Sequence, residues 1–273
     1  MLLQLSIYDR FLKPRIATWG ASAIEISAPM AGDNKALTIT STRAISINSP
    51  KSDVWNWLIQ LGADRGGFYS YIFIEKALGY KTRHQDVIKP EFYTIQVGDL
   101  IRGSIDEKSS SIPYNFRVLY VKPEETFVLD KWGTFLLKEV NSHQTRLIIR
   151  SQETKDSSIW RQAANYIQVP LHYIMERRTL IGIKERAEVG ENAQLSQRDD
   201  ILWFSAIVLS GFIIFLLVFV GRGIIQSLVL PAILSSCWLV VLLLFNPTPL
   251  YSMSLLLIVG SYSLYMILAR LKN

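Results

Sequence analysis

The residue types that usually carry metal or nucleophilic chemistry are few in this sequence and lie far apart. The histidines His84, His143 and His172 fall in different expected elements, and the single cysteine, Cys237, lies in a long apolar run. A zinc site or a Cys/His nucleophile needs these residue types close together. The segment 62–67 also lacks the spacing of a phosphate-binding or dinucleotide-binding loop. We therefore expect no metal and no other cofactor.

Two carboxylates, Glu75 and Glu91, could act as general acid and base. Nothing in the sequence fixes their separation or shifts their pKa values, so an enzymatic reaction has no specific support. No catalytic residue is predicted, and the sequence leans away from an enzyme.

Arg65 precedes Gly66 and Gly67 in a glycine-rich turn. If a helix begins after this turn, the free N–H groups of the two glycines and the guanidinium could hold an anionic head group. In the alternative interpretation, Arg65 simply pairs with Asp64 or Glu75.

Aromatic side chains are the other candidates for a binding site. A hydrophobic pocket with a few hydroxyl groups is typical of small-molecule sites. The same side chains could equally fill a core, and both interpretations stay open. With Arg65, the predicted ligand-binding set is Phe68, Tyr69, Tyr71, Phe73, Trp132, Phe135, Tyr166 and Tyr173.

Arg146 and Arg150 share the parity of Ile148 on an expected strand, so all three point to one face of a sheet. If that face is interior, the arginines must be paired, because a lone buried charge is very costly. The candidate partners are then Asp99, Asp130 and Glu91. If the face is exterior, the arginines are ordinary solvated residues.

The elements that would position these residues follow from periodicity and turn signals. Alternating β-branched residues predict a first strand, and apolar residues at helical spacing predict two short helices separated by glycines. Consecutive short strands then favour an antiparallel meander, and a long helix follows it. The expected ranges are strand 36–48, helices 54–61 and 68–78, strands 93–102, 115–121, 126–132, 134–139 and 145–153, and helix 157–188.

The long helix carries an apolar stripe with one proline, Pro170, at which we expect a kink. The stripe consists of Ile159, Trp160, Ala163, Ile167, Leu171 and Ile174.

The last third of the chain predicts a membrane region. Residues 201–220, 224–245 and 250–269 are three apolar runs of about the 20 residues that a membrane-spanning helix needs. All 23 acidic residues precede position 201, so the basic balance of the whole chain does not indicate nucleic acid. The expected organisation is an N-terminal irregular segment 1–35, a domain 36–189, a linker 190–200 and a membrane region 201–273.

The orientation of the domain is not decided by positive charges near the spans. Lys184, Arg186 and Arg198 on one side balance Arg222, Arg270 and Lys272 on the other. No secretory signal peptide is evident, so we expect a cytoplasmic domain.

Several stretches resemble the START-like, or SRPBCC, superfamily, whose helix-grip fold is shared with birch pollen allergen and polyketide cyclases. The resemblance covers about residues 18–155, and its most specific part is Arg65-Gly66-Gly67-Phe68-Tyr69-Ser70-Tyr71. Other stretches that fit are Trp19-Gly20-Ala21, Met30-Ala31-Gly32-Asp33, Thr42-Arg43-Ala44-Ile45 and Thr145-Arg146-Leu147. The resemblance implies an α+β fold with a sheet wrapped on the C-terminal helix and a cavity between them. It implies no single reaction.

The resulting expectation is a membrane-tethered, cytoplasm-facing domain that binds a hydrophobic small molecule or lipid. The alternatives are an enzyme of the polyketide cyclase type and a structural or interaction module with a filled core. A pocket of several hundred Å³ with convergent polar groups favours the first two, and a solid interior favours the third. Protein partners and oligomeric state stay open.

Overall fold

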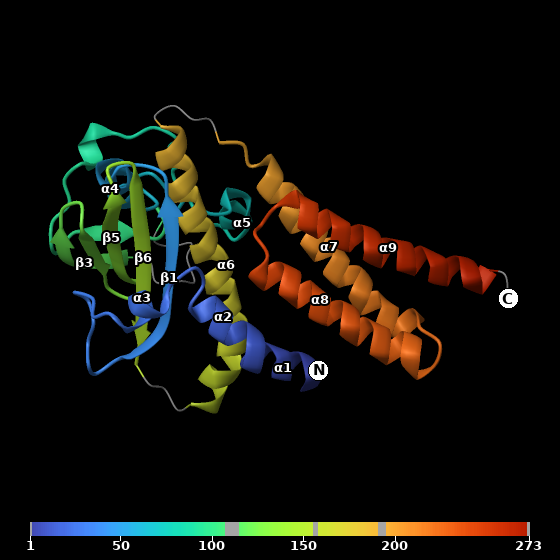
Figure 1. The fold of residues 1–273 in the computed structure, drawn as a ribbon. Helices are drawn as coiled ribbons and strands as arrows, with labels where there is room; N and C mark the ends of the chain where they lie inside the picture. The colour runs from blue at the N-terminus through green and yellow to red at the C-terminus, as the bar shows by residue number, and fades with distance from the viewer. Residues whose placement is uncertain (1, 107–114, 155–157, 191–194, 272–273) are drawn as a thin grey trace. The chain divides into compact units, whose positions relative to one another are not determined.

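A computed structural model of the chain describes residues 2–106, 115–154, 158–190 and 195–271 (Figure 1). The chain forms two compact units. One unit is Ala17–Leu195, which contains a sheet and its helices. The other unit consists of Met1–Ile16 and Ser196–Asn273, and it contains three long apolar helices. Residues 1–35, taken from the sequence as one segment, are thus divided after Ile16.

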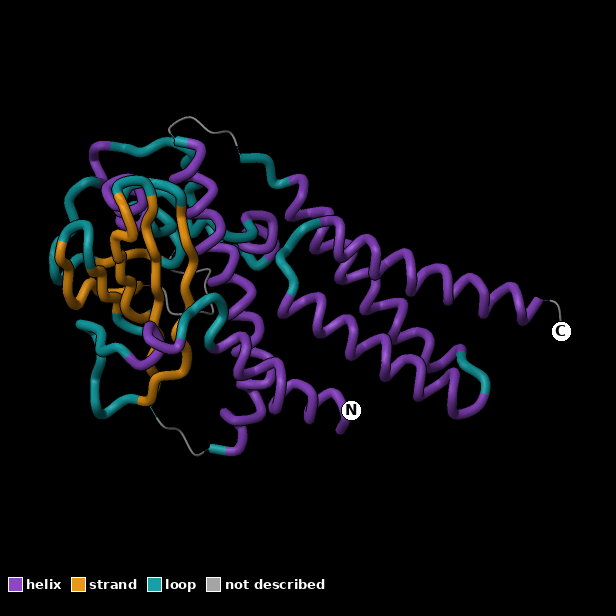
Figure 2. Tube along the Cα trace, viewed as in Figure 1, coloured by secondary structure: helices purple, strands orange, loops and turns teal. Residues whose placement is uncertain are grey.

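The sheet contains six antiparallel strands in the order β1-β6-β5-β4-β3-β2; its strands are orange in Figure 2. Strands β2 to β6 each pair with their neighbour in sequence, and β1 pairs with β6 at the other edge of this open sheet. The predicted meander and the α+β class are confirmed. The strands are β1 (Thr38–Ile47), β2 (Leu100–Arg102), β3 (Asn115–Lys122), β4 (Thr126–Leu129), β5 (Gly133–Asn141) and β6 (Gln144–Glu153).

Two elements are shorter than predicted. The strand expected at 93–102 exists only as β2, and a 3-10 turn, η2 (Pro90–Phe92), precedes it. The helix expected at 68–78 begins only at α5 (Ile72–Ala77). Gly67 and Tyr69 have φ angles of 89° and 55°, and a right-handed helix needs negative φ, so the chain stays irregular up to that point.

One face of the sheet is covered by α4 (Lys51–Ile59) and the C-terminal half of α6 (Ile159–Val189). Inward side chains of the strands meet apolar side chains of both helices in one continuous core. Its members include Val54, Trp57 and Leu58 from α4, Leu180, Ile183 and Ala187 from α6, and Phe127, Phe135, Leu147 and Ile149 from the strands.

The other face is covered by residues 18–36, which we call the N-terminal strap and which include α3 (Ala23–Ser27). Arg150 is buried beneath the strap, and all five of its N–H groups donate hydrogen bonds. The acceptors are Thr42 Oγ1 at 3.0 Å, Asp33 Oδ2 and Ala28 O at 2.8 Å, Glu25 O at 2.9 Å and Ile26 O at 2.8 Å.

Arg146 fixes the other part of the strap. Its Nε and Nη2 donate to the two carboxylate oxygens of Glu25 at 2.7 and 3.0 Å, and Nη2 also donates to the carbonyl of Gly20. Glu25 also forms a capping box with Ser22 at the start of α3. The Arg146 hydrogen bonds, opposed by partial burial, lower the pKa of Glu25 to about 2.

The two arginines thus share one face, as their parity predicts, but neither predicted environment is correct. The face is exterior to the core, yet the strap covers it. The partners are Glu25 and Asp33, and the proposed pairing with Asp99, Asp130 or Glu91 is wrong. These partners were missed because the strap has no strand or long helix to place it against the sheet.

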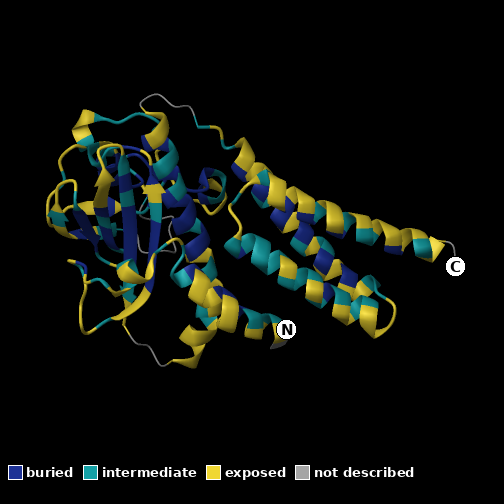
Figure 3. Ribbon diagram, viewed as in Figure 1, coloured by how far each residue is buried: buried dark blue, intermediate teal, exposed yellow. Residues whose placement is uncertain are grey.

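The long helix is confirmed and runs without interruption through Pro170. Most of its predicted apolar stripe is exposed, from Ile159 to Leu171, and only Ile174 is buried. Figure 3 shows the N-terminal half of α6 as mainly exposed and its C-terminal half as largely buried.

Three helices are long and apolar enough to span a membrane, as predicted. They are α7 (Arg198–Val220), a π-helical turn η3 (Ile225–Val229) continued by α8 (Leu230–Leu244), and α9 (Pro249–Leu271). The Trp238 indole of α8 donates to the carbonyl of Ile207 in α7 at 2.8 Å, and it lies against Gly211, where no side chain intervenes.

The same unit contains α1 (Leu2–Ile7), the π-helical turn η1 (Tyr8–Leu12) and the start of α2 (Lys13–Ala17). Gln4 Nε2 donates to Ala232 O at 3.3 Å and to Ser235 Oγ at 3.1 Å, both in α8. The N-terminal residues therefore belong with the membrane region.

Replacing Arg150 by Ala should lower the free energy of unfolding by about 3–5 kcal/mol, because it leaves a carboxylate and several carbonyls beneath the strap without their donor. Urea unfolding of the purified full chain, followed by near-UV circular dichroism, measures this loss. The control is Lys138→Ala, an exposed residue on β5, which should change the value by less than about 0.5 kcal/mol. Equal effects of the two variants would contradict the role assigned to Arg150.

Candidate functional site

Only part of the predicted ligand-binding set comes together in the structure. Trp132 contacts three aromatic rings, with centroid distances of 5.1 Å to Phe116, 5.4 Å to Phe135 and 5.7 Å to Phe68. Trp132 and Phe135 are members of the main core cluster, and Phe68 packs against it. At these spacings the rings are in direct contact, so they occupy the space that a cavity would need.

Tyr69 belongs to the same core but does not present its hydroxyl group to a pocket. The hydroxyl donates to the carbonyl of Trp57 at 3.2 Å, and the two rings meet edge to face at 5.9 Å. Arg186 lies over the Tyr69 ring at 4.5 Å. Burial raises the pKa of this hydroxyl, against the opposing effect of the Arg186 charge. The side chain is therefore a packed core residue.

The other aromatic residues of the set lie elsewhere. Tyr71 and Phe73 contact each other at the start of α5, with centroids 6.0 Å apart. Tyr173 is buried on α6, whereas Tyr166, two turns earlier, is exposed. The nine predicted residues thus do not line one pocket.

Arg65 is not arranged as an anion site. Its Nη2 donates to Phe92 O at 3.0 Å and its guanidinium lies over the Phe92 ring at 4.5 Å. Partial burial lowers its pKa, an effect opposed by the charges of nearby carboxylates. The N–H groups of Gly66 and Gly67 are already bonded to carbonyls at 2.7 and 2.8 Å within the turn. The N–H groups that were predicted to bind a head group therefore already bind carbonyl groups of the chain.

The expected salt bridges of Arg65 are also replaced by other contacts. Asp64 lies 3.7 Å from Arg102, and Glu75 accepts a hydrogen bond from Thr82.

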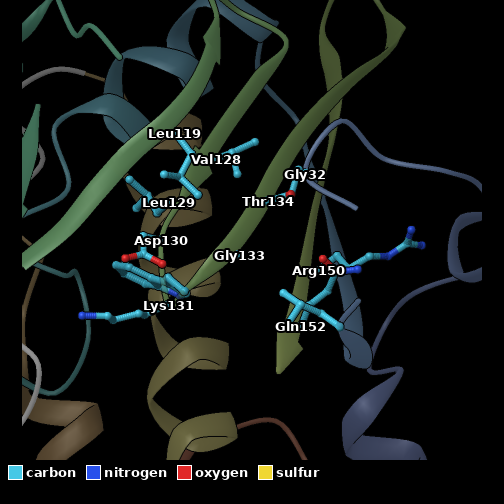
Figure 4. Close-up of a pocket in the computed structure, with 12 residues that line it drawn as sticks. Gly32, Leu119, Val128, Leu129, Asp130, Lys131, Gly133, Thr134, Arg150 and Gln152 are labelled. Carbon is cyan, nitrogen blue, oxygen red and sulfur yellow. The ribbon is translucent and has the colours of Figure 1, made fainter. Parts of the chain in front are cut away.

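A small pocket lies on the outer face of the sheet, at the β4–β5 turn (Figure 4). Its volume is about 90 Å³, well below the roughly 300 Å³ at which small-molecule sites begin. Asp130, Lys131 and Thr134 lie on its wall, but the Arg150 guanidinium points away from Asp130 and Lys131 toward the strap. The pocket is too small for a lipid or a polyketone.

A buried charged cluster on α6 was not predicted from the sequence. Arg43 on β1 forms a salt bridge with Glu176, and His172 Nε2 lies 3.2 Å from the second carboxylate oxygen. The Arg43 guanidinium also lies 5.1 Å from the centre of the Tyr173 ring, and that of Arg177 lies 5.0 Å from it. The signal for this cluster was the parity of Arg43, which matches Ile45 and Ile47 on the helix side of β1.

The pKa of Glu176 reflects two opposing effects. Burial raises it, but the Arg43 charge and the hydrogen bonds from His172 and Arg43 outweigh burial and lower it to about 2. Glu176 is therefore a charged, structurally paired carboxylate near neutral pH and not a proton donor.

The pKa of a second buried carboxylate, Glu75, is shifted in the opposite direction. One oxygen accepts from Thr82 Oγ1 at 2.9 Å, and that hydroxyl lies 3.0 Å from His84 Nε2. The other oxygen, Oε1, has no partner among the described residues. Burial raises the pKa of Glu75, an effect opposed by the hydrogen bond from Thr82. Burial and the charges of Lys76 and Arg186 lower the pKa of His84. Both groups are thus shifted toward their neutral forms.

Neither carboxylate supports an enzymatic site. The two lie in separate networks, and within the described residues no group of three His, Cys, Asp or Glu side chains could hold a metal ion. Perturbed pKa values in packed networks are also found in purely structural ion pairs.

Replacing Glu176 by Gln should destabilise the domain by about 3–5 kcal/mol at pH 7, because Arg43 loses its buried counter-charge. The folded-state pKa lies below the ordinary value of 4.5, so the ion pair stabilises the native state above about pH 4.5 and is lost as the pH falls toward 2. The cost of Glu176→Gln should therefore shrink across that window. Urea unfolding at several pH values measures it, with exposed Glu139→Gln as the control. A pH-independent cost would contradict this assignment.

Glu75→Gln should have the reverse effect. Because the folded state raises the Glu75 pKa above 4.5, the wild-type carboxylate destabilises the native state increasingly as the pH rises above that value. The neutral amide can accept the same Thr82 hydrogen bond without this penalty. Glu75→Gln should match the wild type near pH 4 and be more stable at pH 8, measured by the same unfolding titration. Exposed Glu91→Gln should be neutral at both values. A destabilised Glu75→Gln at pH 8 would show that the carboxylate is needed in its charged form.

Comparison with known proteins does not add a name to this geometry. The chain matches no protein-family model, and no curated protein matches it. Its function must be inferred from its own residues and their contacts.

Proposed function

We propose that this protein is a membrane-anchored structural or interaction module, in which a solid START-like domain is held at the bilayer by three membrane spans. The observation that carries the proposal is the filled interior between the sheet and its two covering helices. In a lipid carrier or a cyclase of this architecture, that region is the ligand cavity.

The packing of the interior supports this choice over ligand binding. Trp57, Phe127 and Phe135 are fully buried in one continuous core, with contacts between aromatic rings across it. The guanidinium of Arg65 and the hydroxyl of Tyr69, both predicted to contact a ligand, donate instead to backbone carbonyls. A small-molecule site needs both space and convergent polar groups, whereas the aromatic rings around Trp132 contact one another.

The element order supports the helix-grip architecture. One strand, two short helices, five antiparallel strands and a long helix follow each other, as the resemblance implies. Because one fold can host many functions, the architecture does not distinguish a carrier from a structural module. The packing of the interior is the observation that distinguishes them.

The order of elements in the chain bears on the orientation. Among the described residues, no candidate span lies between the N-terminal residues and the domain, so we expect both on one side of the membrane. Exposed Arg10, Lys13 and Arg15 then join Lys184, Arg186 and Arg198 on that side, against Arg222, Arg270 and Lys272 on the other. The positive-inside rule now favours a cytoplasmic domain.

Native mass spectrometry of the full chain released from lipid nanodiscs tests the proposal, together with extraction of bound molecules. We expect no stoichiometric apolar ligand beyond annular lipid. Phe135→Ala should destabilise the domain by about 3–5 kcal/mol through the cavity it leaves, whereas Tyr166→Ala, exposed on α6, should have little effect. A discrete bound molecule that is lost in Phe135→Ala but retained in Tyr166→Ala would overturn the module and restore the carrier.

A further inference from the structure

The N-terminal half of α6 carries an apolar surface that no part of the described chain covers. Trp160 is 82% exposed, Ile159 74%, Ile167 66% and Leu171 56%. With Ala163, which is also exposed, these residues lie within an arc of about 120° at 3.6 residues per turn. We call this surface the α6 apolar face.

This face is not an extension of the core-facing side of the helix. Leu180, Ile183 and Ala187 pack into the core, and their direction lies about 150° around the helix from the α6 apolar face. Toward the N-terminus, the positions that point in this core-facing direction are mixed in character and include Gln162, Tyr173 and Glu176. The helix therefore has two apolar surfaces on nearly opposite sides, one in each half.

The composition around the exposed surface fits a lipid interface. From Ile159 to Met175 the sequence contains no acidic residue, and its charged side chain is Arg161. Arg161 lies about 130° around the helix from the α6 apolar face, on the polar side where an interfacial helix meets anionic head groups. Trp160 and Tyr166 are the side-chain types that prefer the boundary between head groups and acyl chains, and Gln162, Asn165 and Gln168 supply a polar opposite side.

The chain itself keeps the C-terminal end of α6 near a bilayer. Only residues 190–197 separate the end of α6 from α7, a candidate span. Fully extended, this linker reaches at most about 30 Å. The local concentration of membrane surface is therefore high without any further anchor.

We propose that the α6 apolar face lies in the surface of the same bilayer that the three spans cross, as an interfacial helix segment that binds anionic phospholipid. Trp160, Ile167 and Leu171 insert below the head groups, to a depth of about 5–10 Å. This surface adds a second, lateral attachment of the domain and is independent of whether the domain's interior holds a ligand.

Site-directed fluorescence of the full chain in nanodiscs tests the proposal. In a Cys237→Ser background, Ala163→Cys places an environment-sensitive label on the face, and Gln168→Cys places the same label on the exposed polar side. Nanodiscs of phosphatidylcholine with phosphatidylglycerol are compared with phosphatidylcholine alone. We expect the Ala163→Cys label to be quenched by doxyl groups on the acyl chains and shielded from acrylamide, more strongly with the anionic lipid. The Gln168→Cys label should show the reverse.

A third variant separates lipid contact from general folding. Ile167→Glu with Leu171→Glu should abolish quenching of the Ala163→Cys label by doxyl lipid, while circular dichroism stays unchanged because both side chains are exposed. If both labels are equally open to acrylamide and insensitive to doxyl lipid, the proposal is wrong. It is also wrong if shielding at Ala163→Cys persists in lipid-free amphipol or requires two copies per nanodisc, since a protein surface is then the occupant.

Discussion

The arrangement of the domain depends on one buried guanidinium. Arg150 sits on the central part of β6, beneath the N-terminal strap, and each of its five N–H groups has an acceptor. A buried charge is tolerated only when it is paired and hydrogen-bonded throughout, and four of these five acceptors lie in the strap. The strap has little regular structure of its own, so Arg150, with Arg146, supplies its specific position on the sheet. Gly20 fits this contact because a side chain there would collide with the carbonyl of Ala44.

Because the strap covers part of the outer face and the pocket there is small, the inner face is the larger candidate for a ligand site, and there apolar side chains pack against one another in one core. The domain has one interior, between the sheet and the two helices that cover it, and side chains that fill this interior leave no binding cavity of the same volume. The aromatic residues favour the first use, since the ring of Trp132 contacts those of Phe135 and Phe68. The buried ion pair between Arg43 and Glu176 on the same side also fixes the position of α6 relative to β1. An interaction module gains from such rigidity, whereas a carrier needs space that opens.

Sequence periodicity predicted the strands and the long helix well, because the pattern of apolar residues directly reflects a buried face. It failed where tertiary contacts decide. The aromatic run around Tyr69 looked helical, but a positive φ at this residue keeps the chain irregular. The partners of Arg150 could not be predicted, because most of them lie in a loop that is far from Arg150 in sequence and has no periodic pattern. The predicted ligand-binding set stays a prediction, since composition does not distinguish a cavity lined by aromatic rings from one filled by them.

The helix α6 shows why a single apolar stripe was also an incomplete description. Its periodic pattern continues from Ile159 to Ile174, but the residues that enter the core, such as Leu180 and Ile183, follow a different direction around the helix. A helix that buries one stripe against a sheet has no folding reason to carry a second stripe on the opposite side. Three further helices of the chain are long and apolar enough to span a membrane, and under the proposal made above the bilayer is the apolar phase that accepts the second stripe. A domain attached both by its linker and along α6 would have a restricted orientation at the membrane.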